Sequence, residues 1–287
     1  MKNNGKDPKP ESLLIRAGAL FGGLTTPDAK LTSLSNRVVT LDRNPESVVV
    51  EGAQPISKVG SGLDAAGFTL FNWNIKKGEI ENWDADLMSL AGDVDLVLIQ
   101  EATQQMDAPR FVGDDAHWSF SQGYSRGKVA SGVATISSVQ PIEHSHLLTV
   151  EPWLRTPKAT MATRFAIQGR EETLLVVNTH MVNFTLGHSA FRRQLADVEG
   201  VLNDHVGPII FSGDFNTWRQ ARYEILLQMT SRYGLTPTSF DSDHRTTFFG
   251  SAVDHIFISG LSVEESTTFK VNSSDHNPMS MRLYLSI

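Results

Sequence analysis

From residue 67 to the C-terminus, short apolar runs alternate with amphipathic stretches. Apolar residues recur at helical spacing over 82–92, 189–206 and 219–234. Eight runs have the length of a strand, and most are rich in β-branched or large apolar residues. They are FTLFNWNI (68–75), VDLVLIQEA (94–102), SGVATISS (131–138), ATMATRFAI (159–167), TLLVVNTHM (173–181), PIIFSGD (208–214), VDHIFIS (253–259) and MSMRLYL (279–285). Since a doubly wound fold carries less sheet than this, the pattern predicts two packed β-sheets with helices outside.

The helix predicted over 189–206 has an apolar stripe that runs from Phe191 to Val206. Ser189 stands where an N-cap is expected, and we interpret Gln194 as a helix-packing residue. The helix that follows ends at Gly234, a residue typical of a helix C-terminus.

The first 66 residues have a different character. They are rich in Gly, Pro, Ser and Asn and have little periodicity, although VVTL and SVVV are compatible with short strands. We therefore predict an irregular N-terminal extension over 1–66 and one domain over 67–287.

Composition narrows the function classes. The formal net charge of −7 argues against a protein that coats nucleic acid by charge alone, although a local basic patch is compatible with it. The chain has no cysteine, so a thiolate zinc site or a cysteine nucleophile is excluded. No apolar run approaches the roughly 18 residues of a membrane span. We expect a soluble protein, cytoplasmic rather than periplasmic, and the sequence leaves its oligomeric state open.

Polar residues gather where the predicted strands end or begin. Such a set is a better indicator of a site than any one strand-end residue. The residues concerned are Asn74, Glu101, His180, Asp214, Asn216, Asp254, Asp275 and His276.

These residue types suggest a chemistry. Asn74, Glu101 and Asp275 offer only oxygen ligands, which suit Mg²⁺ before Ca²⁺ or Mn²⁺. Two histidines could handle protons or stabilise negative charge, and Asp254 could hold His276 in one tautomer. A hard metal ion with two histidines and no covalent nucleophile indicates hydrolysis of a phosphate ester by activated water.

The segment PIIFSGDFNTW (208–218) allows two interpretations. If the chain stays extended, Asp214 and Asn216 point to the same side, as expected of an active-site pair at a strand end. Gly, Asp and Asn are also common turn residues, so the segment taken alone favours a turn.

Six short motifs, NWNI, IQEA, NTH, GDFN, VDHIF and SDHNP, occur in an order that resembles the endonuclease/exonuclease/phosphatase superfamily, the DNase I-like fold. SGVATIS and VVNTHMVNFTLG resemble a bacterial YafD-like subgroup more closely. The resemblance covers 67–287 and implies an α/β four-layer sandwich, with two packed mixed β-sheets flanked by helices.

The resemblance also implies roles. Glu101 would bind the metal, with Asn74 at the metal or phosphate and Asp275 supporting the metal or His276. Asp214 would position or deprotonate the attacking water, and Asn216 would hold the phosphate. His180 would stabilise charge on the phosphoryl oxygens. His276, oriented by Asp254, would transfer protons or stabilise charge.

The resemblance implies a phosphate-ester substrate and favours a phosphodiester in DNA or RNA, cut with Mg²⁺, for which Mn²⁺ would substitute. A lipid or small-molecule phosphatase or phosphodiesterase, and a catalytically silent binding scaffold, are the alternatives. Further candidates for phosphate contacts are Asn178, Asn183, Arg155 and Lys158, and for a basic patch Arg155, Lys158, Arg192, Arg193, Lys76 and Lys77.

Two motifs point elsewhere. GYSRG (123–127) matches the nucleophile elbow of α/β-hydrolases, but a strand pattern follows it where the elbow needs a helix. The pair His144 and His146 could bind zinc, but no third ligand lies nearby in the sequence, so a surface turn is favoured.

Overall fold

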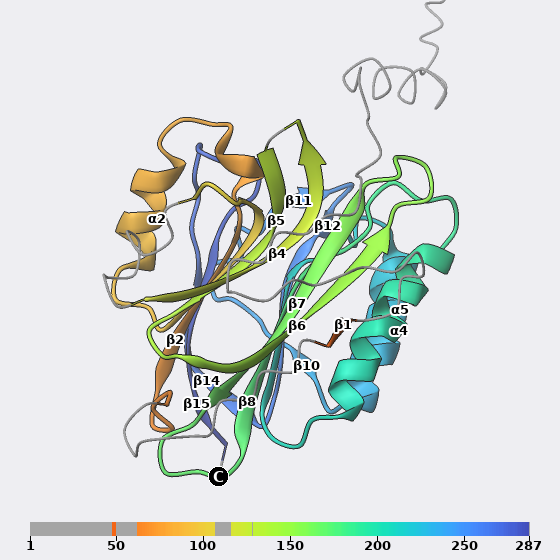
Figure 1. Ribbon diagram of the computed structural model, residues 1–287. Coiled ribbons are helices and arrows are strands. Elements are labelled where there is room, and N and C mark those ends of the chain that lie inside the picture. Colours follow the sequence, from red (N-terminus) through yellow and green to blue (C-terminus); the bar gives the residue numbers. More distant parts are fainter. Residues whose placement is uncertain (1–47, 50–61, 107–115, 128, 287) are drawn as a thin grey trace, which may run out of the picture.

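The computed structural model describes residues 48–49, 62–106, 116–127 and 129–286 (Figure 1). Two β-sheets pack face to face, and helices cover their outer surfaces, which confirms the predicted DNase I-like α/β fold. Most of the predicted N-terminal extension, including VVTL, lies outside the described residues.

The first sheet has seven strands, two of them very short. Neighbours are antiparallel except for the parallel pair β8–β9. In spatial order its strands are β1 (Val48–Val49), β6 (Pro141–Val150), β7 (Pro157–Ala166), β8 (Thr173–His180), β9 (Ile209–Asp214), β13 (Asp254–Ser259) and β10 (Thr236–Pro237).

The second sheet has six strands, and its only parallel neighbours within the described chain are β2 and β3. The small hairpin of β11 (Thr247–Phe248) and β12 (Ser251–Ala252) stands apart from both sheets. The six strands, in spatial order, are β14 (Leu261–Thr268), β15 (Met279–Leu285), β2 (Phe68–Asn74), β3 (Leu96–Thr103), β5 (Val129–Ser137) and β4 (His117–Arg126).

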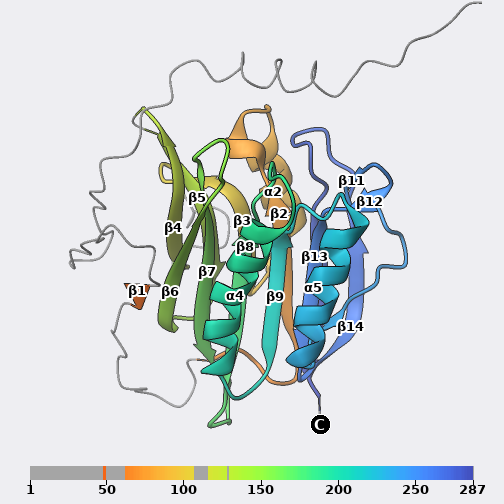
Figure 2. The same cartoon turned by 90° about the vertical axis from the view of Figure 1, so that its right-hand side faces the viewer.

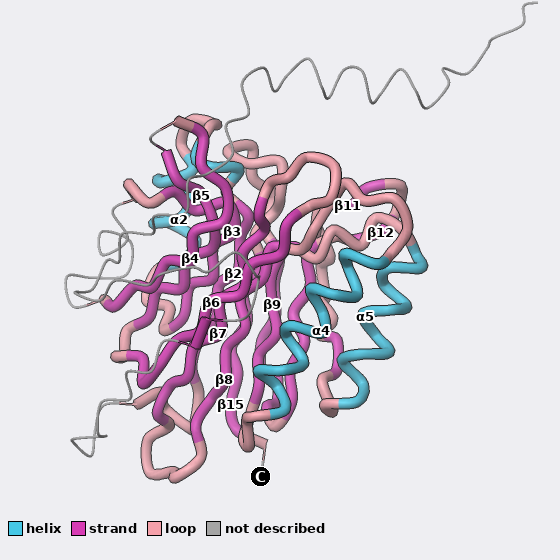
Figure 3. Tube along the Cα trace, turned by 45° about the vertical axis from the view of Figure 1, so that its right-hand side comes forward, coloured by secondary structure: helices cyan, strands magenta, loops and turns pink. Residues whose placement is uncertain are grey.

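Helices form the outer layers. α4 (Ser189–Asn203) and α5 (Gln220–Arg232) lie on the outer face of the first sheet, and α2 (Trp83–Ala91) lies outside the second (Figures 2 and 3). A short 3-10 helix, η1 (Lys76–Gly78), follows β2. Among the described residues, no helix has the length and apolar character needed to cross a membrane.

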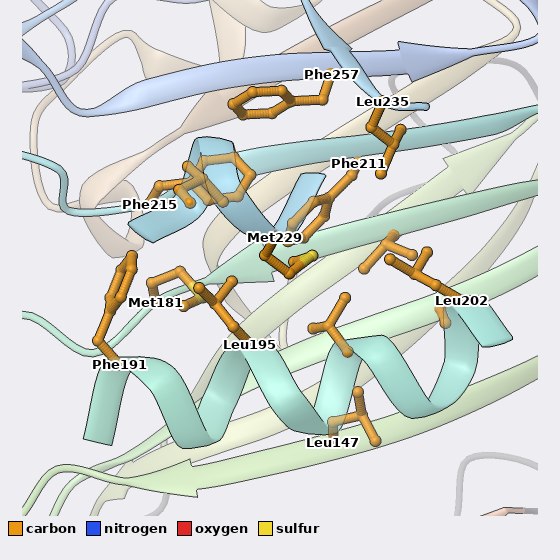
Figure 4. Packing of buried hydrophobic residues seen from close by; sticks show 14 of the residues in the cluster. Leu147, Met181, Phe191, Leu195, Leu202, Phe211, Phe215, Met229, Leu235 and Phe257 are labelled. Atoms are coloured by element: carbon orange, nitrogen blue, oxygen red, sulfur yellow. The ribbon is translucent and has the colours of Figure 1, made fainter. Parts of the chain in front are cut away.

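Four apolar clusters hold these layers together. Along β9, Ile209 and Phe211 face the helices while Ile210 faces the other sheet. This alternation explains why the strand reads as a continuous apolar run, since both of its faces are covered. Figure 4 shows the cluster between the helices and the first sheet, where Leu195 of α4 and Met229 of α5 meet Phe211.

The helix ends differ from the sequence prediction in two details. Ser189 is the first residue of α4 rather than its cap, a position held by His188. The helix ends at Asn203, so Val206 is not part of the apolar stripe and is 90% exposed. After α5, Gly234 has φ +64°, the left-handed conformation expected of a helix-terminating glycine.

Candidate active site

Strand ends from both sheets meet around one pocket of about 260 Å³. The parallel pairs β2–β3 and β8–β9 end there, and β13, antiparallel to β9, begins there. Of the eight residues predicted at strand ends, seven line the pocket, and Asp254 lies buried behind His276. The seven are Asn74, Glu101, His180, Asp214, Asn216, Asp275 and His276.

The carboxylate of Asp214 is the meeting point of these side chains. Asn74 Nδ2 donates a hydrogen bond to Asp214 Oδ2 over 3.1 Å. The Nε2 atoms of His180 and His276 lie 3.5 Å and 3.9 Å from the same oxygen. Burial raises the pKa of Asp214 to about 6, although the charge on His276 acts in the opposite direction. The group can therefore exchange a proton near neutral pH.

His276 is held in a charged state. Its Nδ1 donates to Asp254 Oδ2 over 2.7 Å, and both residues are buried. Burial disfavours the imidazolium ion, but the carboxylates of Asp254 and Asp214 outweigh burial and raise the pKa of His276 to about 10. Trp73 Nε1 donates to the His276 carbonyl oxygen over 2.8 Å and so fixes the backbone.

His180 is in the opposite protonation state. Its Nε2 lies 2.8 Å from Lys158 Nζ, which donates to the neutral ring. Burial and then the charge of Lys158 lower the pKa of His180 well below its ordinary value. The positive charge on this wall of the pocket is therefore carried by Lys158 and not by His180.

The backbone turns directly after Asp214. Asn216 has φ +51°, and its amide donates to Asp214 Oδ1 over 3.0 Å, as in an Asx turn. Both residues nevertheless line the pocket, so the segment is a turn that also contributes to the site. Gly213 allows this, because a Cβ there would lie 2.0 Å from the carbonyl oxygen of Thr179 on β8.

Glu101 and Asp275 face two lysines. Lys77 Nζ lies 3.3 Å from Glu101, and Lys76 Nζ lies 3.6 Å from Asp275. Glu101 sits at a β-bulge with φ +54°. These carboxylates attract cationic groups inside the pocket, and carboxylate and amide oxygens together form a donor set that fits a hard divalent cation.

A second acidic cluster joins Asp214, Asp254 and His276, whose ligand atoms lie within 4.8 Å of one another. Here the Nδ1 of His276 is occupied by its hydrogen bond to Asp254, and both oxygens of Asp214 already accept hydrogen bonds, from Asn74 Nδ2 and from the Asn216 amide. We therefore favour the side of the pocket with Glu101 and Asp275 for a metal.

The four further candidates for phosphate contacts do not all line the pocket. Lys158 and Asn183 line the pocket, but Arg155 is not among its lining residues. Asn178 is fully buried between the sheets, where it accepts a hydrogen bond from Gln100 and donates to the Ala134 carbonyl. This placement removes Asn178 from the phosphate-binding candidates, because its polar atoms already have partners.

The two rival motifs do not form the sites they suggested. GYSRG spans the end of β4 at a bulge and the turn at Gly127, not a strand-turn-helix elbow, and Ser125 Oγ accepts a hydrogen bond from Gln122. His144 and His146 lie on β6 rather than in a turn, with ring centroids 5.2 Å apart.

Several buried polar residues behind the pocket were not recognised in the sequence. Gln194, predicted as a packing residue, donates to the His180 carbonyl and accepts from the Val182 amide. Arg222 of α5 donates to the carbonyl of Asn216 over 3.1 Å. Both residues had a single signal in the sequence. Each is polar and stands at a helix position that the apolar periodicity places on the inward face.

The chain belongs to the Endonuclease/Exonuclease/phosphatase family, whose model matches residues 71–276. This confirms the family predicted from the motifs. Membership supports a phosphoester hydrolase, and enzymes of this family are generally metal-dependent.

Relatives at 32% and 35% sequence identity are UPF0294 proteins, of the YafD family. One from Vibrio parahaemolyticus is 32% identical over 253 residues, which cover 84% of this chain and 89% of that protein. One from Vibrio cholerae is 35% identical over 253 residues, covering 86% and 88%.

Solved structures share the fold at low identity. The human Nocturnin catalytic domain with bound sulfate anion has a TM-score of 0.61 at 18% identity, covering 78% of this chain and 96% of that one. A family protein from Bacteroides vulgatus has a TM-score of 0.61 at 16% identity, covering 77% and 100%.

Proposed function

We propose that the domain over 67–287 is a divalent-metal-dependent phosphodiesterase, and that its substrate is DNA or RNA. One observation carries the proposal. A buried carboxylate, Asp214, lies between a protonated histidine and a neutral one, in a pocket that also holds the oxygen donors Glu101 and Asp275. This combination supplies a proton acceptor, a proton donor and a place for a cation around one phosphate.

Glu101 and Asp275 would hold the metal ion, with Asn74 beside them. Mg²⁺ is the expected ion and Mn²⁺ a substitute, because all the donors are oxygens. When bound, the ion would polarise the phosphoryl oxygen and lower the pKa of water. The ammonium groups of Lys76 and Lys77 would then move from the carboxylates toward the substrate phosphate.

The attacking water would lose its proton to Asp214. The hydrogen bonds from Asn74 Nδ2 and from the Asn216 amide fix the two oxygens of this carboxylate, so its orientation is set before the substrate binds. Asn74 is therefore a positioning residue as well as a neighbour of the metal.

Negative charge on the transferring phosphoryl group would be stabilised from two sides. Lys158, hydrogen-bonded to His180, brings a cation to one wall of the pocket. The imidazolium of His276, held by Asp254, faces the other side and can donate its Nε2 proton to the leaving oxygen. Asn216 also lines the pocket and would contact the phosphate, with its Nδ2 held by a hydrogen bond to the Met181 carbonyl oxygen over 3.0 Å.

DNA or RNA is favoured because Lys76, Lys77 and Lys158 all line the pocket, although the chain as a whole carries a charge of −7. The pocket is also lined by Glu101, Glu151, Asp214 and Asp275, so Lys76 and Lys77 would be free to contact several phosphates once a metal ion pairs with Glu101 and Asp275. A lipid or small phosphate ester needs only one phosphate site, and a silent scaffold has no need of the His276–Asp254 pair.

Purified protein incubated with Mg²⁺ and a panel of substrates tests the proposal. The panel is plasmid DNA, single-stranded DNA, RNA, sphingomyelin and small phosphomonoesters. We expect cleavage of a nucleic acid, lost in Asp214→Asn and retained in Ser125→Ala. Efficient turnover of sphingomyelin or a phosphomonoester without nucleic-acid cleavage would overturn the nuclease assignment, and no turnover of any phosphoester would overturn the hydrolase.

A further inference from the structure

Large apolar side chains stand exposed on three loops around the pocket. Five of them, which we call the apolar rim, are Trp153, Phe184, Leu186, Phe248 and Phe249, with exposed fractions of 52%, 56%, 71%, 46% and 88%. The rim continues into the pocket, whose walls include Leu154 together with Phe184 and Phe248. Exposed apolar groups gathered at a pocket mouth mark a binding surface more often than scattered ones do.

Contacts between the loops connect the parts of the chain that carry the rim. The rings of Phe249, on the β11–β12 hairpin, and Trp218 have centroids 6.0 Å apart. Trp218 Nε1 donates to Asn183 Oδ1 over 2.9 Å, which joins the hairpin to the loop after β8. The carboxylate of Glu151 accepts from the amides of Asn183 and Phe184, which joins that loop to the turn between β6 and β7.

Buried charged groups hold two of these loops in place. Arg222 donates to the carbonyls of Val182 and Asn183 and to Thr185 Oγ1. Glu151, also buried, accepts a further hydrogen bond from Thr156 Oγ1 over 2.8 Å. The loops that carry Trp153, Phe184 and Leu186 are thus ordered before any ligand binds, which lowers the entropy cost of binding.

The chemistry of the rim is aromatic and cationic. Four of its five members are aromatic, and the guanidinium of Arg219 lies 4.4 Å from the ring centroid of Trp218 beside it. Flat apolar faces next to cations are the features that bind unpaired bases, by stacking and by attraction to phosphates.

We propose that the apolar rim binds unpaired bases of a single-stranded nucleic acid whose scissile phosphate occupies the pocket. This inference rests on the proposed phosphodiesterase activity and specifies its substrate. Duplex is disfavoured, because paired bases already stack on one another and present few free faces. A membrane surface is disfavoured because Phe184 and Phe248 line the phosphate pocket itself. In a phospholipid, glycerol and its ester groups separate the apolar acyl chains from the phosphate, whereas in a nucleic acid a flat base is attached to each sugar that flanks the phosphate.

Binding of a fluorescein-labelled oligothymidylate, followed by anisotropy with Mg²⁺ in a His276→Ala background, tests the inference. Phe249→Ala and Trp153→Ala should each weaken binding by about 5- to 150-fold, the effect of losing one stacked base. Both side chains are exposed, so neither change should impair folding. The matched control is Val206→Ala, an exposed apolar residue beyond the C-terminal end of α4.

Unchanged oligothymidylate affinity in both rim variants would overturn the inference, as would an equal loss with duplex of the same length. Rim-dependent binding to phosphatidylglycerol vesicles, with no effect on the oligonucleotide, would also overturn it and make the rim a membrane contact. Hydrolysis of bis(4-nitrophenyl) phosphate by the unsubstituted protein reports on the phosphodiesterase separately. Turnover of this diester with no rim effect leaves the proposed function standing while the rim assignment fails.

Discussion

At the scale of single residues, the two histidines of the pocket differ in charge because their neighbours differ. His276 lies against two carboxylates, and its pKa is raised to about 10. His180 lies against the Lys158 ammonium group, and its pKa is lowered well below the ordinary value. Residue type alone allowed either histidine to carry the proton, so the division of roles follows from the contacts.

Asp254 and His276 should act through one interaction. If Asp254 only orients and charges His276, then Asp254→Asn combined with His276→Ala should cost little more activity than His276→Ala alone. We expect a loss of roughly 10²–10⁴-fold in kcat/KM for His276→Ala, the range of a proton-transfer group. A double variant that shows the full product of the two single losses would refute the pairing. Ser125→Ala serves as the control and should keep full activity.

At the scale of elements, one arginine of α5 supports the loops behind the pocket. Arg222 is fully buried and remains charged at neutral pH, although burial lowers its pKa to about 10. Its two terminal nitrogens bind three carbonyl oxygens and one hydroxyl. These bonds tie α5 to the turn at Asn216 and to the loop after β8.

Loss of Arg222 should therefore destabilise the fold. Arg222→Met removes the charge but keeps an apolar chain of similar length, and leaves buried carbonyls without donors. We expect the free energy of unfolding, measured in urea, to fall by about 3 kcal/mol. The neighbouring Arg219→Met, at an exposed position, should change it by less than about 0.5 kcal/mol. Equal effects of the two substitutions would contradict the role given to Arg222.

Strand β6 carries a pair of histidines that makes the fold sensitive to acid. Burial, and then the proximity of His144, lower the pKa of His146 from 6.5 to about 4. As the pH falls from about 6.5 toward 4, the unfolded chain takes up a proton at this position before the folded protein does. Folded stability is therefore lost over that interval.

We expect His146→Gln to reduce the loss of unfolding free energy between pH 6.5 and pH 4, as measured by urea titration at each pH. His188→Gln, at the start of α4, removes a histidine without touching β6 and is the control. An acid slope that His146→Gln leaves unchanged would show that this histidine does not contribute.

The elements also show where the sequence was informative. The predicted strands were correctly located because apolar runs such as VDLVLIQEA are covered on both faces. β14 was missed because it lies at an edge of its sheet, and its sequence LSVEESTT is largely polar and exposed. β4 is likewise an edge strand, and β6, which pairs with β7 on one side, has only the short β1 on its other side.

For the site, strand ends predicted which residues meet, but not how they are charged or supported. Asn178 looked like a pocket residue because it precedes His180 by two positions, yet it points between the sheets. Arg222 and Glu151 could not be recognised, because their partners are backbone groups of loops distant in sequence. Such contacts depend on the tertiary path of the chain, which local patterns do not specify.

At the scale of the whole molecule, charge is unevenly distributed. The formal net charge is −7, yet Lys76, Lys77 and Lys158 all line one pocket. A protein with this charge distribution should bind polyanions only through the pocket. Its non-specific binding to duplex DNA should be limited.

Cleavage of single-stranded DNA at limiting substrate should accordingly weaken as salt rises, with a log–log slope of about −0.7 per phosphate contact. Lys76→Ala combined with Lys77→Ala should reduce the slope by up to about 1.4, or two contacts of about 0.7 each. Arg282→Ala, which removes an arginine paired with Glu264 on the second sheet, should leave the slope unchanged. A negligible slope in the unsubstituted protein would contradict the assignment of these lysines to substrate phosphates.

The most direct test of the metal-dependent hydrolase is to measure Mn²⁺ binding by electron paramagnetic resonance and phosphodiester cleavage on the same samples. We expect the unsubstituted protein to bind Mn²⁺, to lose turnover of bis(4-nitrophenyl) phosphate in excess chelator, and to regain it with Mg²⁺ or Mn²⁺ but little with Zn²⁺. Glu101→Gln should stay folded while both Mn²⁺ binding and turnover fall, and Glu264→Gln, at an exposed site on β14, should change neither. Full turnover in excess chelator, or unimpaired binding and turnover in Glu101→Gln, would contradict the assignment.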